Sequence, residues 1–496
     1  MAGAMAVELE IGSIAAGGDG VGRVGGLVVF VPRTAPGDLV RARVAPAVGR
    51  RFVRGSLEAV LRPSPDRVEP SCAHYVIDRC GGCQLQHLGY DAQLGAKAGI
   101  VRDALTRLAR REVGTVAVAA SPLHWRYRRK LTLAMRRVRG REWVAGLHRF
   151  DAPDDVFPLT DCPITDAGVV GIWRQISEHV DLLPDAAALR VAVRALSEGY
   201  AFVVEGGERW GRAESRALAA AVPGLVEIWW TAGSRAAPPS GGGPANRRSR
   251  GSRGSRGGPG GARGPDRRGM RGPRPGRMPA RLMTVPTRRQ AHAPVSVDRS
   301  AERVVAAGSD RAGGRGAATG ASFVQVNAEV GAAVHAGVVR RALAYDPATA
   351  VDGYAGTGTT AAALARHGVR VTAIEADRDA AGWASRTLPP GSRMIAGRVE
   401  DVLSRALPAD VVVLNPPRAG LDPAVPRTLA QAAPPPRAVI YVSCDPATLA
   451  RDLARLDGWR IADVQAYDMF PQTAHVETVC ELVPPSAHQR AAEAGR

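Results

Sequence analysis

The chain has 496 residues, more than a single ordinary domain uses, so we expect two or three domains. Apolar residues make up 45% of it, but no apolar run approaches the roughly 18 residues of a membrane span, which excludes a helical membrane protein. Residues 1–10 lack the basic and apolar segments of a secretory signal. We therefore expect a cytoplasmic, monomeric protein without a membrane partner.

The net charge of +19 favours a polyanionic partner such as a nucleic acid. Its distribution is uneven, because 13 arginines and one acid lie between Ser234 and Arg281, so that this block supplies +12 and the rest of the chain +7. The only lysines are Lys97 and Lys130. We attribute this preference for arginine to a GC-rich genome.

Residues 1–62 are predicted to form a small β-barrel of the OB type. Short apolar or alternating runs separated by glycine turns are typical of such barrels, which often bind oligonucleotides. A barrel without a ligand explains this segment equally well. The expected strands are 7–11, 26–31, 40–44 and 51–60.

Residues 63–233 are predicted to form a mixed α/β central domain. A loop-like stretch up to about residue 90 precedes a segment with helical periodicity, residues 91–110. The expected strands are 130–135, 142–147, 201–204 and 226–230.

Four of the six cysteines fall in this central domain. Cys72, Cys80 and Cys83 are close in sequence, two glycines separate the last two, and Cys162 follows at a distance. A large cytoplasmic protein rarely uses structural disulfides, so clustered cysteines indicate a metal site. Four thiolates can hold either zinc or a [4Fe–4S] cluster. The single Cys-x2-Cys pair favours iron–sulfur, because zinc ribbons usually show two tight pairs.

Residues 234–320 are predicted to be a largely disordered insertion rich in Arg, Gly and Pro. The block from Ser234 to Arg281 has no aromatic residue and cannot bury enough apolar surface to fold. A non-specific RNA tether and a tolerated insertion without a role fit it equally well.

Residues 321–496 alternate strands and helices, which predicts an α/β fold with a doubly wound parallel sheet of the Rossmann-like kind. In such a sheet the ligand binds at the carboxyl ends of the strands. The expected strands are 350–352, 369–374, 393–396, 411–414 and 438–442, and the expected helices are 359–366, 378–386, 399–406 and 424–431.

A nucleotide site is expected after the first two of these strands. Gly356 and Gly358 let the backbone approach a ligand at a helix N-terminus. Glu375 ends the second strand, where its carboxylate can bind ribose hydroxyls. Enzymes that use NAD and enzymes that use S-adenosylmethionine share this arrangement, so these residues alone leave both open.

The ends of the fourth and fifth strands favour methyl transfer. Asn415 precedes a stiff Pro-Pro turn, an arrangement typical of methyltransferases that hydride transfer does not need. Cys444 ends the fifth strand between Ser443 and Asp445-Pro446, which favours a nucleophile over a buried core cysteine.

A thiol in this place suits methylation of carbon 5 of uracil, which is a poor nucleophile. Thiolate addition at carbon 6 makes an enolate whose carbon 5 can attack a sulfonium methyl. Glu477 is the expected base that then removes the carbon-5 proton. His475 and Glu477 are predicted to share one face of a strand, with Cys480 on the other face in the core.

Taken together, these motifs resemble the RNA uracil-5-methyltransferase family, specifically its iron–sulfur branch with an N-terminal TRAM domain. The resemblance covers most of the chain outside residues 234–320. Its motifs, in the family's order, are Cys80-Gly-Gly-Cys83-Gln84-Leu85-Gln86-His87, Phe323-x-Gln325-Val326-Asn327, Asn415-Pro-Pro-Arg-x-Gly, Ser443-Cys444-x-Pro446-x-Thr448-Leu449-Ala450-Arg451-Asp452 and Phe470-Pro-x-Thr-x-His475-x-Glu477.

The resemblance implies that S-adenosyl-L-methionine is the methyl donor and RNA the substrate, ribosomal rather than transfer RNA. It implies Cys444 as nucleophile and Glu477 as base. It further implies that Gln325, Tyr354, Glu375 and Asn415 contact the methyl donor and that Cys72, Cys80, Cys83 and Cys162 hold a [4Fe–4S] cluster.

Asn415 departs from the family, which usually has Asp there, and the substitution keeps an acceptor but loses the charge. This departure motivates an inactive RNA-binding relative as the alternative from another class. A cytosine-5-methyltransferase is the enzymatic alternative, although it places its nucleophile in a Pro-Cys after the fourth strand, where Pro417-Arg418 stands here. An NAD enzyme leaves Cys444 and the clustered cysteines unexplained.

Overall fold

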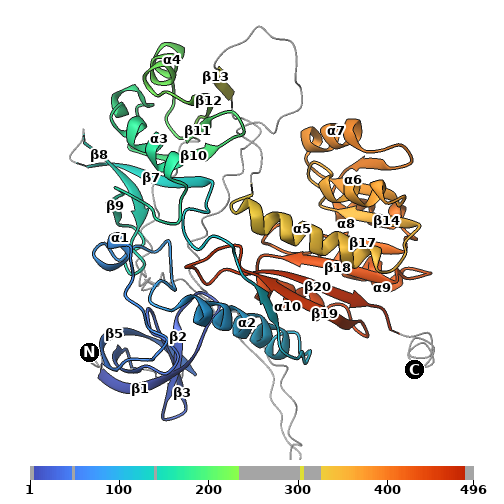
Figure 1. The fold of residues 1–496 in the computed structure, drawn as a ribbon, viewed down its shortest axis with the longest axis horizontal. Helices are drawn as coiled ribbons and strands as arrows, with labels where there is room; N and C mark the ends of the chain where they lie inside the picture. The colour runs from blue at the N-terminus through green and yellow to red at the C-terminus, as the bar shows by residue number, and fades with distance from the viewer. Residues whose placement is uncertain (1–4, 47–50, 139–141, 234–301, 307–324, 486–496) are drawn as a thin grey trace, which may run out of the picture. The chain divides into compact units, whose positions relative to one another are not determined.

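The computed structural model describes residues 5–46, 51–138, 142–233, 302–306 and 325–485 (Figure 1). These residues form a closed barrel, a seven-stranded sheet and an eight-stranded sheet. Apart from one strand, the predicted insertion 234–320 lies outside the described residues, and so does Phe323 of the family motif. Within the described ranges no helix is long and apolar enough to cross a membrane.

The N-terminal barrel confirms the predicted barrel, and its strands follow the order β1-β2-β3-β5-β4 (blue in Figure 1). Side chains alternate between its inside and its outside, as they do along any strand. On β4, for example, Val40, Ala42 and Val44 are buried while Arg41 and Arg43 are exposed. The strands are β1 (Met5–Ile14), β2 (Gly20–Val24), β3 (Leu27–Val31), β4 (Leu39–Val44) and β5 (Phe52–Arg62).

The central sheet has the strand order β13-β12-β11-β10-β7-β8-β9. Asp166 caps the start of helix α3, because its carboxylate accepts a hydrogen bond from the Val169 amide at 3.1 Å. The buried face of α3 packs in one core with the sheet. The elements are α1 (Ala73–Val76), β7 (Lys130–Val138), β8 (Glu142–His148), β9 (Val156–Pro158), α3 (Ala167–Ser177), η1 (Val180–Leu182), β10 (Ala188–Ala195), β11 (Tyr200–Glu205), α4 (Arg212–Ala221), β12 (Leu225–Thr231) and β13 (Glu302–Ala306).

The C-terminal sheet has the order β16-β15-β14-β17-β18-β20-β19-β6. Its first five strands pair in parallel, as predicted, but β20 runs antiparallel to both β18 and β19, so the sheet is mixed rather than all-parallel. Its strands are β6 (Ala117–Ala119), β14 (Thr349–Gly353), β15 (Arg370–Glu375), β16 (Arg393–Ala396), β17 (Val411–Leu414), β18 (Ala438–Ser443), β19 (Arg460–Tyr467) and β20 (Glu477–Val483).

Helices cover both faces of this sheet. Along β18, Val439 and Tyr441 belong to one apolar cluster, whereas Ile440 and Val442 belong to another. The first cluster includes residues of α2, α8, α9 and α10, and the second includes residues of α5 and α6. The helices are α2 (Tyr90–Arg107), α5 (Ala328–Leu343), α6 (Thr359–Arg366), α7 (Arg378–Thr387), α8 (Val399–Ala406), α9 (Ala424–Gln431) and α10 (Pro446–Leu453).

Residues 90–119 fall in the segment that the sequence assigned to the central domain, yet α2 packs against the C-terminal sheet and residues 117–119 form its edge strand β6, which was not predicted. β6 pairs in parallel with β19, and the buried face of α2 packs in the same core as α10. Residues 90–119 therefore help to build the sheet that carries the candidate site. The domain boundaries proposed from the sequence remain predictions.

Candidate active site

The predicted nucleotide loop follows β14 and turns sharply into α6. Gly356 and Gly358 have positive φ of 55° and 80°, and Tyr354 shares this left-handed conformation at 62°. Asp352 is buried below the loop, where its carboxylate accepts a hydrogen bond from the Ala361 amide at 2.9 Å. Burial raises the pKa of Asp352 to about 7. The loop is thus tied to the first turn of α6, where backbone amides are available to a ligand.

Glu375 lies at the end of β15, beside this loop. One of its carboxylate oxygens accepts a hydrogen bond from the Gly356 amide at 2.8 Å, and the other accepts one from the Asp377 amide at 2.7 Å. The carboxylate therefore holds the glycine loop in the structure. Its predicted contact with a ribose remains a prediction.

Two further residues of the predicted cofactor site, Gln325 and Asn415, lie before α5 and after β17. Gln325 is exposed just before α5, and its side chain packs against Gly331, where an added Cβ would come within 3.1 Å of it. Asn415 is exposed at the end of β17, and its amide donates to the carbonyl of Gly353 at 3.3 Å. Asn415 thus stands beside the end of β14, from which the nucleotide loop starts.

Cys444 follows β18 directly and is half-buried. The next residue, Asp445, caps α10 by accepting hydrogen bonds from the amides of Ala447 and Thr448 at 2.9 and 3.1 Å. β18 and β20 pair antiparallel, and Ser443 lies opposite Thr478. Cys444 and Glu477 are the next residues after this pair, so they lie opposite each other at the ends of the two strands. The structure therefore brings the predicted nucleophile and the predicted base together.

His475 does not share the strand of Glu477. β20 starts at Glu477, and residues 471–476 form a turn and an irregular segment in which Gln472 has a φ of +69°. The prediction of one strand that carries both side chains was therefore wrong, because the backbone turns before Glu477. Cys480, which is fully buried in the core, lies where it was expected.

Burial and nearby charges shift the pKa values of Cys444 and Glu477, some upward and some downward. Burial is the main reason that the pKa of the Cys444 thiol rises to about 11, and Glu477 adds to the rise. Burial likewise raises the pKa of Glu477 to about 7. The Arg418 guanidinium lowers the pKa of both groups. In the sequence Arg418 stands out only as part of the Asn415-Pro-Pro-Arg motif, and its electrostatic influence on the two groups could not be inferred from its position there.

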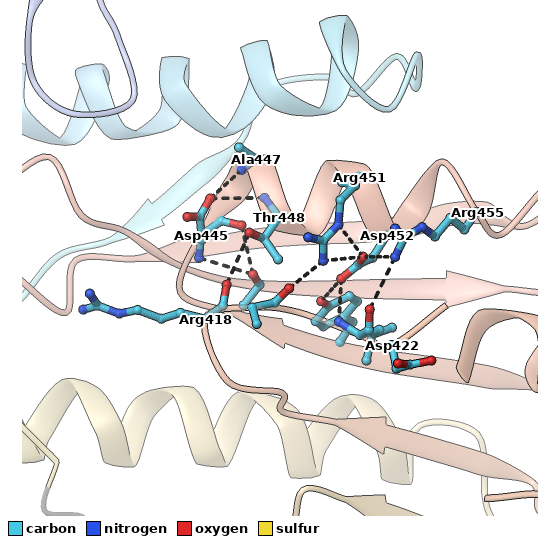
Figure 2. Close-up of polar contacts among 12 residues, drawn as sticks. Arg418, Asp422, Asp445, Ala447, Thr448, Arg451, Asp452 and Arg455 are labelled. Atoms are coloured by element: carbon cyan, nitrogen blue, oxygen red, sulfur yellow. Dashed lines mark hydrogen bonds and ion pairs between the residues drawn. The ribbon is translucent and has the colours of Figure 1, made fainter. Parts of the chain in front are cut away.

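A buried carboxylate fixes the loop that carries Arg418. Asp452 accepts hydrogen bonds from the Tyr441 hydroxyl and the Leu421 amide, both at 2.8 Å. The Arg451 guanidinium pairs with the same carboxylate and donates to the Ala419 carbonyl at 2.7 Å (Figure 2). Two residues of helix α10, Arg451 and Asp452, thereby fix the backbone of Ala419 and Leu421 in the loop that follows Asn415.

The four clustered cysteines are all buried and unbridged in the core of the central sheet. Burial raises the pKa of Cys80 to about 12 and lifts those of Cys83 and Cys162 above the ordinary value, and negative charge on neighbouring cysteines of the set adds to each rise. The four sulfurs are therefore within electrostatic reach of one another. In the part of the chain that is described, no three His, Cys, Asp or Glu side chains are arranged to hold a single metal ion.

Comparison with known proteins gives the family. A family model described as tRNA (Uracil-5-)-methyltransferase matches residues 392–483, the stretch that contains Asn415, Cys444 and Glu477. An uncharacterized RNA methyltransferase of Gloeobacter violaceus is 32% identical over 488 residues, which cover 96% of each chain. A second one, from Thermosynechococcus vestitus, is 30% identical and covers 96% of this chain and 97% of its own.

A solved structure shows the same fold. The tRNA (uracil-54, C5)-methyltransferase of Pyrococcus abyssi, in complex with S-adenosyl-L-homocysteine, aligns with 96% of this chain and 100% of its own at a TM-score of 0.59 and 22% sequence identity. The relatives match this chain along nearly their whole length, and the family model falls on the candidate site. The chain belongs to the RNA uracil-5-methyltransferase family.

Proposed function

We propose that the protein methylates carbon 5 of a uridine in RNA, with S-adenosyl-L-methionine as methyl donor and a covalent bond between Cys444 and the uracil as intermediate. The observation that carries the proposal is the pairing of β18 with β20, which sets Cys444 beside Glu477. A nucleophile and a base on neighbouring strand ends are what addition and elimination at one pyrimidine ring require.

Cys444 performs the first step. Its thiolate adds to carbon 6 of the uracil, which breaks the double bond to carbon 5 and leaves an enolate. Because the pKa of the thiol is about 11 in the protein without RNA, the thiolate needs a nearby positive charge. Arg418 is such a charge, and its guanidinium already holds the pKa below the value that burial alone would give.

The nucleotide loop and its neighbours hold the methyl donor. S-adenosyl-L-methionine, when bound, supplies a methyl group on a sulfonium that the enolate carbon 5 attacks. We assign its contacts to Gln325, Tyr354, Gly356, Gly358, Glu375 and Asn415. In support of this assignment, five of these residues lie at the carboxyl ends of β14, β15 and β17 or in the loop that follows β14, where sheets of this kind bind their ligands.

Glu477 completes the reaction. Its carboxylate removes the proton from carbon 5, the double bond between carbons 5 and 6 forms again, and the bond between carbon 6 and Cys444 breaks to release the thiolate. A pKa of about 7 suits this task, because the carboxyl is partly ionised at neutral pH and basic enough to accept a proton.

We further propose that Cys72, Cys80, Cys83 and Cys162 hold a [4Fe–4S] cluster. Four buried thiols that repel one another when ionised fit a group that carries positive charge, because iron favours the thiolate form. Glycines beside Cys83 also suit the site, since the Gly82 amide donates to the sulfur of Cys80 at 3.3 Å. The cluster, when bound, has a structural role in this proposal and takes no part in the methyl transfer.

The barrel of residues 1–62 is proposed as a TRAM-like RNA-binding domain, and the cationic block of the insertion as an additional RNA contact. We propose ribosomal RNA as the substrate, a cytoplasmic location and a monomeric state. Transfer RNA is the alternative, and the relatives' names leave room for both.

Methyl transfer to defined transcripts tests this proposal. Ribosomal and transfer RNA transcripts would be incubated with the purified protein and labelled S-adenosyl-L-methionine, digested to nucleosides and separated. We expect 5-methyluridine in one transcript and none with Cys444→Ala, whereas Cys480→Ala, a matched buried cysteine on β20, should retain activity. A 5-methylcytidine product, or 5-methyluridine from Cys444→Ala, would contradict the proposal.

A further inference from the structure

Lys97 is one of only two lysines among the 66 basic residues of the chain. Its side chain is fully buried in α2 and pairs with the equally buried Asp468. The Lys97 ammonium also donates to the Phe470 carbonyl at 3.0 Å, and the Tyr90 hydroxyl donates to the second Asp468 oxygen at 2.8 Å. A planar guanidinium with five donors does not fit the place of a compact ammonium. A lysine therefore suits this buried position, in a chain whose basic residues are otherwise almost all arginine.

The acceptors of Lys97 belong to the loop of residues 468–476, which joins β19 to β20 and leads directly to Glu477. Gln93, one helical turn before Lys97, forms two hydrogen bonds with Gln472 of this loop. The Gln93 side-chain amide donates to the Gln472 side-chain oxygen at 3.0 Å, and the Gln472 backbone amide donates to the Gln93 oxygen at 2.9 Å.

Residues after the clustered cysteines hold the same loop from another side. The amides of Gln84 and Leu85, which directly follow Cys83, both donate to the Gln472 carbonyl, at 3.1 and 3.0 Å. The Tyr127 hydroxyl donates to the Pro471 carbonyl at 3.0 Å. These contacts stabilise Gln472 in a left-handed conformation, with a φ of +69°, that costs energy for a residue other than glycine.

We infer that Lys97 and Gln93 are positioning residues for the base, which hold the 468–476 loop so that the carboxylate of Glu477 reaches carbon 5 of the uracil. This inference rests on the proposed function, because it assigns to Glu477 the removal of the carbon-5 proton. Both residues lie more than 370 positions before the loop in the sequence. Within the described residues, no hydrogen bond or ion pair joins either side chain to Cys444 or to the nucleotide loop.

Substitution of Lys97 or Gln93 should slow one chemical step, the elimination. Cys444 is placed by β18 and by the capped start of α10, so its addition to carbon 6 should not depend on Lys97 or Gln93. Elimination should depend on them, because a base displaced by about 1 Å from its proton loses roughly 100-fold in rate. A protein with a displaced base should therefore accumulate covalent adduct on ordinary uridine.

The test uses two variants of the full chain. Gln93→Leu removes both hydrogen bonds to Gln472, and the double variant Lys97→Met/Asp468→Asn removes the ion pair without leaving a buried charge unpaired. The control is Arg111→Met, just beyond α2, which removes a hydrogen bond to the Leu456 carbonyl at 2.9 Å and leaves the loop untouched. The substrate is the transcript that the wild-type protein methylates, made with uridine or with 5-fluorouridine, and the adduct is counted on denaturing gels.

We expect both variants to trap the 5-fluorouridine transcript within about twofold of the wild-type rate, and to accumulate adduct on ordinary uridine with elimination slowed roughly 100-fold. Arg111→Met should show neither effect. Wild-type elimination in both variants, or a parallel loss of trapping and elimination, would show a merely structural role and overturn the inference. If the wild-type protein itself traps no 5-fluorouridine, the proposed function fails instead.

Discussion

The pKa of Glu477 leads to a quantitative prediction for the elimination step. Burial raises it to about 7 from an ordinary value of 4.5, so that deprotonation occurs within the neutral range. The ionised fraction rises from about one tenth at pH 6 to about nine tenths at pH 8. If the carboxylate is the base, breakdown of the methylated adduct should become about tenfold faster over this interval and level off above it.

The addition step should respond to pH in a different way. The thiol of Cys444 has a pKa of about 11, so its thiolate fraction rises about tenfold for each pH unit across the same interval, without levelling off. The two steps can therefore be separated by the shape of their pH profiles. Glu477→Gln keeps the size of the side chain but cannot accept the proton, and elimination should slow by about 10²- to 10⁴-fold and lose its pH dependence.

Single-turnover kinetics measures both steps. Protein, methyl donor and transcript are mixed, quenched at intervals, and the covalent complex is quantified on denaturing gels between pH 6 and pH 9. Glu481→Gln, on the same strand, is the matched control, because its carboxylate accepts a hydrogen bond from Tyr345 away from Cys444. An elimination rate that is flat from pH 6 to pH 8, or that Glu477→Gln leaves unchanged, would refute the role of Glu477 as base.

Four further predictions follow from the site and the sequence. Asn415→Asp restores the family's usual residue and should keep or raise the methylation rate, measured under saturating methyl donor. Asp452→Ala leaves the buried Tyr441 hydroxyl and Leu421 amide without their acceptor and should lower the free energy of unfolding by about 1–3 kcal/mol in chemical denaturation. Anaerobically purified protein should carry about four irons, and Cys83→Ser should lose them; stoichiometric zinc would contradict this. Deletion of Ser234–Arg281 should leave an active enzyme whose RNA binding depends less steeply on salt, because 12 net charges are removed.

The parallel strands of the C-terminal sheet were predictable because each is a short, uninterrupted apolar run. β17, for example, consists of Val411–Leu414 and is buried throughout, as the two-sided cover of a parallel sheet requires. Helix α8 was predictable for the complementary reason, because only one of its faces is apolar. Cys444 and Glu477 were predicted separately from their motifs, but their adjacency follows from the antiparallel pairing of β18 with β20, which no local pattern encodes.

The features that the sequence did not reveal depend on contacts between distant parts of the chain. β6 has only three residues, Ala117–Ala119, and is a strand because it pairs with residues 465–467. The pair of Lys97 with Asp468 joins residues 371 positions apart. His475 was misplaced because the alternation of residues 475 and 477 resembles a strand, whereas Gln472 already turns the backbone.

The most direct test of the account is the site of the covalent bond. A 5-fluorouridine transcript of the substrate RNA, incubated with the protein and S-adenosyl-L-methionine, should form a stable complex, because fluorine at carbon 5 cannot leave as a proton does. After nuclease and protease digestion, mass spectrometry should find a methylated 5-fluorouracil nucleotide on the peptide that contains Cys444. Continued methylation of uridine by Cys444→Ala, or an adduct on a different residue of the wild-type protein, would contradict covalent catalysis by Cys444.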